Sequence, residues 1–192
     1  MNARNAFWLV GSICAALFVV AGLVCLRIYV LNPYRVPTAG MVPTIRPGDL
    51  VWGYKLAYSV PGDVQRYDVV VHRAKLPDGR IQVYAKRVIG LPGDAIRTEG
   101  RRVFLNGAEL PQEFLRTDGP FSLFNEVAGG ARHQIALQLA SSPASHPPDV
   151  DLMVPADSFF LLGDNRMNSF DSRYTGCVSW IDIIGKIIWP VR

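Results

Sequence analysis

The sequence has little charge, and its charge is not concentrated. Asp, Glu, Lys and Arg make up 19% of the 192 residues, against about 25% in typical globular proteins. Hydrophobic residues reach 49%, which excludes a disordered chain. The net charge is only +4 and no basic tract is present, so nucleic acid is not indicated as a partner. A mildly basic chain suits an anionic membrane surface better.

Cysteine and histidine are too scarce for a disulfide framework or a metal site. Cys14 and Cys25 share one apolar run, where a helix would separate them by about 16 Å. Cys177 stands alone, and no His or Cys lies at metal-ligand spacing from Asp164 or Asp171. No cofactor or metal is therefore expected. The histidines are expected to be structural or solvated: His72, His133 and His146.

The sequence has no repeats and no long amphipathic helix, but it has one long apolar run. Residues Ala6 to Leu26 carry no charge over 21 positions, enough for about 30 Å of helix. A cleaved secretory signal is the alternative, but such runs span about 7 to 15 residues and end at small residues. An uncleaved anchor is therefore favoured, with Trp8 and either Tyr29 or Tyr34 at the membrane interfaces. The flanking arginines leave its orientation open.

The remaining chain is patterned for strands. Asn106-Gly107 predicts a tight hairpin turn after a strand, and the polar, proline-rich stretch Ser141–Asp149 predicts a surface loop. Alternating and apolar runs bounded by Gly, Pro and Asp predict a mainly β domain. The predicted strands are Asp68–Arg73, Gln82–Ile89, Arg102–Leu105, Phe159–Leu162 and Ile183–Trp189.

Three segments carry the chemistry: Val36–Asp49, Tyr84–Asp94 and Gly163–Gly176. Together with the apolar run, they resemble the type I signal peptidases, from about Tyr34 to Gly185. The resemblance implies an antiparallel β catalytic domain over residues 35–192, with a β-rich insertion or looser region at about 107–154. Residues 1–34 would form the tail and a single transmembrane anchor, where many relatives have two.

The resemblance also implies an activity. Type I signal peptidases are membrane-anchored serine endopeptidases that remove signal peptides from exported preproteins at the outer face of the bacterial inner membrane. They use a Ser/Lys dyad and no metal. The implied partners are preproteins with small residues before the cut and membrane lipid, not nucleic acid.

Lys86 falls on the family's general base. In an extended strand it shares a face with Tyr84 and Val88. Burial beside such neighbours disfavours the ammonium form, which is what a lysine base near neutral pH requires.

The nucleophile position is occupied by Gly40, where the family has serine. Thr38 matches the position whose hydroxyl completes the oxyanion hole together with the N–H of residue 40. Thr44 lies four residues away, and small displacements of an attacking atom cost about 100-fold in rate. We therefore expect the chain to be inactive or strongly impaired.

The resemblance assigns supporting roles as well. Ser169 would orient Lys86 by a hydrogen bond, and Asp171 with Arg173 would brace the loop. The positions that match the two pockets for small substrate residues are Tyr34, Val36, Pro37, Met41, Ile45, Tyr84 and Ala85.

Two other functions remain open at this point. One is a non-catalytic paralogue that binds signal peptides, which Gly40 favours. The other is a specialised peptidase of a secretion or conjugation system.

Overall fold

The computed structural model describes residues 3–76, 78–128, 130–137 and 147–189. The part of the predicted loop that spans residues 141–146, with His146, lies outside the described residues. The prediction of a mainly β protein with one N-terminal apolar helix is confirmed.

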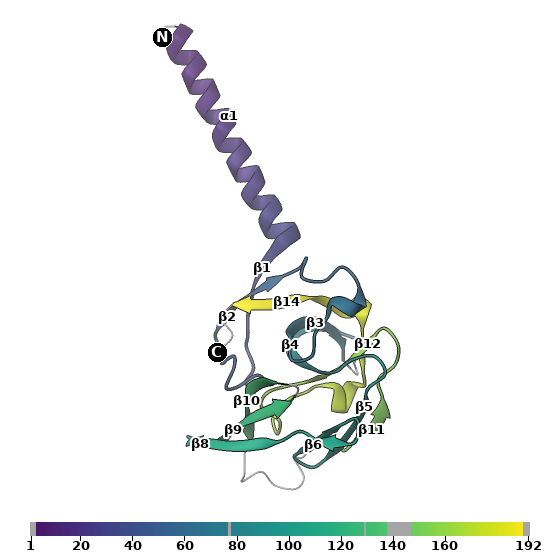
Figure 1. Ribbon diagram of the computed structural model, residues 1–192. Helices are drawn as coiled ribbons and strands as arrows, with labels where there is room; N and C mark the ends of the chain where they lie inside the picture. The colour runs from purple at the N-terminus through teal and green to yellow at the C-terminus, as the bar shows by residue number, and fades with distance from the viewer. Residues whose placement is uncertain (1–2, 77, 129, 138–146, 190–192) are drawn as a thin grey trace.

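Helix α1 (Ala3–Cys25) continues into a π-helical turn at Leu26–Val30. Residues Gly11–Val30 are long and apolar enough to cross a membrane, and the domain buries none of that stretch. Figure 1 shows α1 extending away from the β domain. Trp8 and Tyr29 are about two-thirds exposed near opposite ends of the helical segment. A helix that exposes apolar side chains on all sides needs lipid or another apolar partner around it.

The main sheet has seven strands, and all of its pairings are antiparallel. It contains all the predicted strands except Arg102–Leu105. Because β1 begins four residues before residue 35, it crosses the expected boundary between anchor and domain. In spatial order the strands are β1 (Leu31–Arg35), β2 (Leu50–Tyr54), β14 (Ile183–Trp189), β3 (Val69–Lys75), β4 (Ile81–Gly90), β12 (Ser158–Leu162) and β13 (Val178–Ser179).

Two smaller antiparallel sheets lie on the side of the domain away from α1 (Figure 1). The predicted hairpin is confirmed, because Asn106 and Gly107 join β6 to β7 with φ values of 53° and 83°, as a type I′ turn requires. One sheet has the order β11 (Asp151–Met153), β5 (Ala95–Glu99), β6 (Arg102–Leu105), β7 (Ala108–Glu109). The other has the order β10 (Ala131–Leu137), β9 (Phe121–Ala128), β8 (Gln112–Asp118).

The second small sheet is joined directly to the third sequence segment. The Ala136 N–H in β10 donates to the Asp164 carbonyl at 2.8 Å, and the Arg166 N–H donates to the Ala136 carbonyl at 3.1 Å. These bonds fix the start of the Gly163–Gly176 loop, which later includes the short helix α2 (Ser172–Thr175). A region that matches the family loosely in sequence thus supports the loop structurally.

The main sheet is buried on both faces around β3 and β4. Val69 and Val71 pack into one apolar cluster and Val70 into another, as alternation along a strand dictates. The first cluster lies beneath the segment that follows β1, and its buried members are Val36, Met41, Ile45, Val51, Val69, Val71 and Ile187.

Candidate active site

Lys86 lies in the middle of β4, opposite Val70 of β3, and is only 2% exposed to solvent. Burial lowers the pKa of its amine to about 8, although Asp171 and Asp164 act in the opposite direction. The Nζ atom lies 5.2 Å from the centre of the Tyr84 ring. The expected burial of Lys86 is therefore present, and the amine is partly neutral just above neutral pH.

Gly40 lies buried in the turn after β1 and faces Lys86. A Cβ at Gly40 would lie 3.2 Å from Lys86 Nζ and 3.6 Å from both Ser169 Oγ and the Asn168 carbonyl oxygen. The three sequence segments therefore meet at this point. A small side chain at residue 40 fits with a slight shift of the flexible lysine tip.

Ser169 is buried, but its Oγ has no hydrogen-bond partner within the described residues. The hydrogen bond to Lys86 implied by the resemblance is therefore not formed among them. Oγ and Nζ both border the space in which a side chain at residue 40 would lie.

Gly163 allows the third segment to approach the first. A Cβ at Gly163 would overlap Ser169 Oγ and the Gly40 carbonyl oxygen. The Asn165 N–H also donates to the Gly40 carbonyl at 3.1 Å, and its side-chain amide donates to the Ala39 carbonyl at 3.1 Å. The position of Gly40 is thus set by the loop that carries Ser169.

The charge pair of the third segment is present. Arg173 donates to the two carboxylate oxygens of Asp171 at 2.9 and 2.7 Å, and the Gly163 N–H donates to Asp171 at 3.0 Å. Burial alone would raise the pKa of Asp171, but these donors and the Arg173 charge hold it below the ordinary value. Asp171 therefore stays ionised and fixes the loop around Ser169.

Sequence reasoning missed a second ionic group on the opposite face of β4. Arg87 donates to both carboxylate oxygens of Asp164, at 2.8 and 2.6 Å, and to the Tyr67 carbonyl. The Thr44 hydroxyl also donates to Asp164. Asp164 was considered above only as a metal ligand, and that role was rejected. The available signal was Arg87 itself, a charged residue within an apolar strand.

A third ionic group, also missed, links the small sheet to the loop. Arg166 donates to the two carboxylate oxygens of Glu126 in β9, at 2.7 and 2.5 Å, and both residues are almost fully buried. His133 Nε2 in β10 lies 3.2 Å from Glu126 Oε1. His133 is thus structural, as expected, and so is buried His72, whose pKa burial lowers to about 4.

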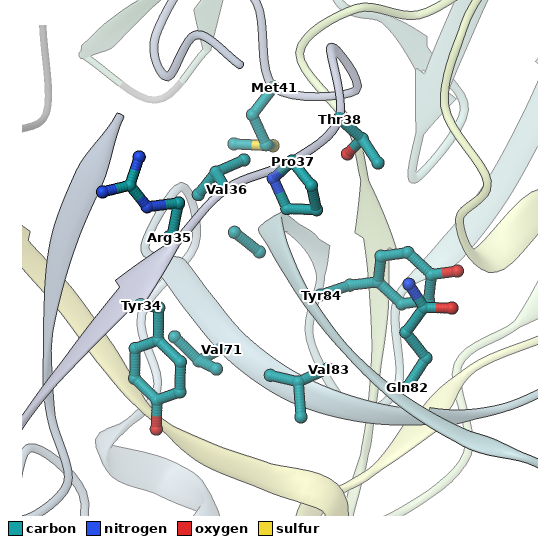
Figure 2. A pocket seen from close by; sticks show the side chains of 11 residues that line it. Tyr34, Arg35, Val36, Pro37, Thr38, Met41, Val71, Gln82, Val83 and Tyr84 are labelled. Carbon is teal, nitrogen blue, oxygen red and sulfur yellow. The ribbon is translucent and has the colours of Figure 1, made fainter. Parts of the chain in front are cut away.

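An apolar pocket of about 190 Å³ lies beside the group formed by Gly40, Lys86 and Ser169. Figure 2 shows Val36, Pro37 and Met41 on one side of it and Val71 and Val83 on the other. Thr38 lines this pocket. So do six of the seven predicted substrate-contacting residues: Tyr34, Val36, Pro37, Met41, Tyr84 and Ala85.

The assignment of Ile45 to this pocket needs correction. Ile45 is fully buried in the apolar cluster beneath the pocket and is not among its lining residues, because the turn that follows Met41 carries it inward. The sequence also missed four lining residues, of which Val71 was accessible to prediction because it pairs with Ala85 across β3 and β4. The four are Arg35, Val71, Gln82 and Val83.

Comparison with known proteins gives consistent results. The family model described as signal peptidase, peptidase S26, matches residues 8–191. Signal peptidase I from Pseudomonas fluorescens is 36% identical over 196 residues, covering 86% of this chain and 68% of that protein. Signal peptidase I from Bacillus caldolyticus is 33% identical over 180 residues, covering 87% and 84%.

Among solved structures, a signal peptidase I from Enterococcus faecalis V583 is 27% identical and covers 65% of this chain and 97% of that chain, with a TM-score of 0.41. The family match spans nearly the whole sequence, including all three converging segments. The chain therefore belongs to the signal peptidase I family, serine endopeptidases that remove signal peptides.

Proposed function

We propose that this chain is a membrane-anchored signal peptidase scaffold that binds signal peptides. The base of its catalytic dyad is in place, and its nucleophile is missing. The observation that carries the proposal is the position of Gly40, whose Cβ direction points to within 3.2 Å of Lys86 Nζ. A serine here would place its hydroxyl next to a buried amine of lowered pKa. Activation of a serine nucleophile requires a base placed next to its hydroxyl in this way.

The pocket supports recognition of an extended peptide with small side chains. Its cavity of about 190 Å³ is lined mainly by apolar atoms and lies between the segment after β1 and strand β4. A peptide lying along these segments would place a small residue next to Gly40, in the manner of strand addition. Thr38, which is exposed at the pocket, and the Gly40 N–H would then stabilise a developing oxyanion.

With serine at residue 40, the reaction follows from these positions. Lys86 in its neutral form takes the hydroxyl proton as the oxygen attacks the scissile carbonyl, and it then returns that proton to the leaving amine. Water, activated by the same lysine, hydrolyses the acyl-enzyme. The Asp171–Arg173 pair fixes the loop that places Ser169 beside the lysine.

With glycine at residue 40, covalent catalysis is absent. In one serine protease, loss of the nucleophile alone costs about 10⁶-fold in kcat. We therefore expect this chain to leave preproteins uncut on the timescale of an active relative.

The test is cleavage of a preprotein with an Ala-x-Ala site in detergent. Three forms are compared: the unmodified chain, Gly40→Ser, and Gly40→Ser with Lys86→Ala. We expect only Gly40→Ser to cut. Cleavage by the unmodified chain would overturn the assignment of residue 40 and direct attention to Thr38.

A second candidate function, a signal-peptide-binding paralogue without catalysis, is favoured by Gly40 itself. It predicts that the unmodified chain and Gly40→Ser both bind the preprotein and that neither cuts it. The same three-way comparison therefore separates the two functions.

We further propose that α1 crosses the bacterial inner membrane once, with the β domain on the outer face. The apolar stretch Gly11–Val30, none of which the domain buries, supports the crossing. Protease added to spheroplasts should degrade the β domain, whereas a cytoplasmic domain would be protected until lysis.

A further inference from the structure

The buried ionic groups around the site carry an unequal number of charges. Within the described residues, three buried carboxylates each pair with one buried guanidinium. The pairs are Asp164 with Arg87, Glu126 with Arg166, and Asp171 with Arg173. All six residues are at most 6% exposed. Their charges cancel, and a proton on neighbouring His133 would only add positive charge.

Lys86 is the remaining cation of this group. Within the part of the chain that the structure describes, its amine forms no ion pair and donates no hydrogen bond, although the residue is 2% exposed. Buried charges in proteins are normally paired. Asp171 and Asp164 act on the ammonium through space, but each of these carboxylates is already paired with an arginine. No carboxylate among the described residues contacts the amine directly.

Other polar groups around Gly40 are also without partners. Ser169 Oγ is buried without a hydrogen bond among the described residues, and in the same set the Gly40 N–H donates none. Both lie next to the Lys86 amine. They do not line the peptide pocket themselves, but Thr38 and Met41 on either side of Gly40, and Ala85 next to Lys86, do. Because residue 40 has no side chain, a ligand atom can take the position of a Cβ, 3.2 Å from the Lys86 amine and 3.6 Å from Ser169 Oγ.

We propose that this site binds the free C-terminal carboxylate of a peptide ending in a small residue, such as a signal peptide that has already been cleaved. One carboxylate oxygen accepts from the Lys86 ammonium and Ser169, and the other accepts from the Gly40 N–H. The terminal small side chain enters the pocket. An uncut preprotein presents an uncharged amide at this point and leaves the ammonium without a partner.

The inference rests on the proposed function, because the peptide must lie along the same pocket. It goes further in stating which chemical form of the peptide is preferred. It also gives the Gly40 substitution a consequence for binding, since a side chain at residue 40 would lie 3.2 Å from the amine and compete with the carboxylate.

The test compares two peptides on the full-length chain in detergent at pH 7. Both carry a fluorophore at the N-terminus and end in Ala-x-Ala, one as the free acid and the other as the C-terminal amide. Anisotropy titration should give at least about tenfold tighter binding of the acid, as expected for a charge-assisted hydrogen bond. Equal affinities would overturn the proposal without any variant being needed.

Two variants locate the preference. Lys86→Met should bring the acid and amide affinities together, and Gly40→Ala should reduce the preference by filling the carboxylate position. Lys75→Met is the matched control, because it removes the same charge from an exposed position on β3, and it should keep the full preference. A preference that survives Lys86→Met, or that Lys75→Met also removes, would overturn the proposal.

Failure of this inference differs in its readout from failure of the proposed function. If Gly40→Ser cuts preproteins while the unmodified chain binds acid and amide equally, the peptidase scaffold stands and carboxylate capture does not. If acid and amide differ as predicted but Gly40→Ser never cuts, carboxylate capture stands and the catalytic assignment falls.

Discussion

Lys86 and Arg87 are adjacent cations in β4 that face opposite sides of the sheet, and both are at most 5% exposed. Arg87 makes a two-pronged pair with Asp164 and also donates to the Tyr67 carbonyl. Lys86 makes no such pair within the described residues and has a pKa lowered by burial. The fold accommodates both charges, but it neutralises only one.

The difference distinguishes a structural charge from a functional one. A buried guanidinium that is fully paired connects β4 to the loop starting at Gly163 and has no capacity to exchange a proton. A buried amine without a counter-ion is unstable as an ammonium and is therefore ready to lose a proton or bind an anion.

The largest expected effect is on catalysis. Starting from Gly40→Ser, replacing Lys86 by Met should lower the rate of preprotein cleavage by about 10⁴-fold or more, because no base remains to take the hydroxyl proton.

The pH profile of Gly40→Ser tests the same base in a second way. Since the base must be deprotonated, kcat/KM should rise with pH until it passes about 8. A profile that is flat between pH 6 and 9 would contradict a lysine base.

The next largest effect is on stability, through Arg87→Met. This change leaves the Asp164 carboxylate buried with its main partner removed, which costs about 3–5 kcal/mol of unfolding free energy. Thermal unfolding in detergent measures it, with Arg101→Met as a control at an exposed position. An Arg87→Met chain as stable as its control would show that the pair contributes nothing.

Lys86→Met should act in the opposite direction. At pH 7 the unfolded chain binds the lysine proton more tightly than the folded chain, so the buried ammonium costs about 3 kcal/mol. Removing it should raise the unfolding temperature at pH 7, whereas Lys75→Met should not. The unmodified chain should itself gain stability between about pH 8 and 10.5, so the advantage of Lys86→Met should shrink over that range. Destabilisation by Lys86→Met at pH 7 would contradict the account.

The smallest effect is expected for Thr44→Val, which removes one donor from Asp164 and keeps the shape of the side chain. We expect a loss of about 2 kcal/mol in unfolding free energy, typical of a hydrogen bond to a charged group. Cleavage by Gly40→Ser with Thr44→Val should continue. Loss of cleavage in a folded double variant would instead assign Thr44 a part in the reaction.

Much of this comparison was accessible from sequence. Alternation along Tyr84, Lys86 and Val88 predicted the burial of the lysine, and the Asn106-Gly107 turn was correct because its φ values are a local property. Five strands were predicted from local patterns, one of them β6 in a small sheet. The other strands of the two small sheets were not predicted, nor were β1, β2 and β13 of the main sheet.

The missed features depend on contacts between distant segments. Nothing in the sequence near Glu126 indicates that it pairs with Arg166, forty residues later. Nothing near Ala136 indicates that it forms a β-bridge with Asn165. Ile45 carries the same apolar character as the pocket residues, and only the course of the turn places it in the core. Alternation along the strand places Lys86 and Arg87 on opposite faces, and this was predictable. The carboxylate that neutralises Arg87 belongs to Asp164 in the third segment, and local sequence does not indicate this contact.

The most direct test of the account is the pKa of Lys86 in the unmodified chain. The sequence contains four lysines, Lys55, Lys75, Lys86 and Lys186, so an NMR titration of lysine-labelled protein in detergent can be assigned with Lys86→Met. We predict that the signal lost in Lys86→Met titrates near 8, well below the ordinary value of 10.5. A Lys86 pKa at or above 10.5 would show that the amine is paired or solvated, and would contradict both the catalytic and the carboxylate-binding assignments.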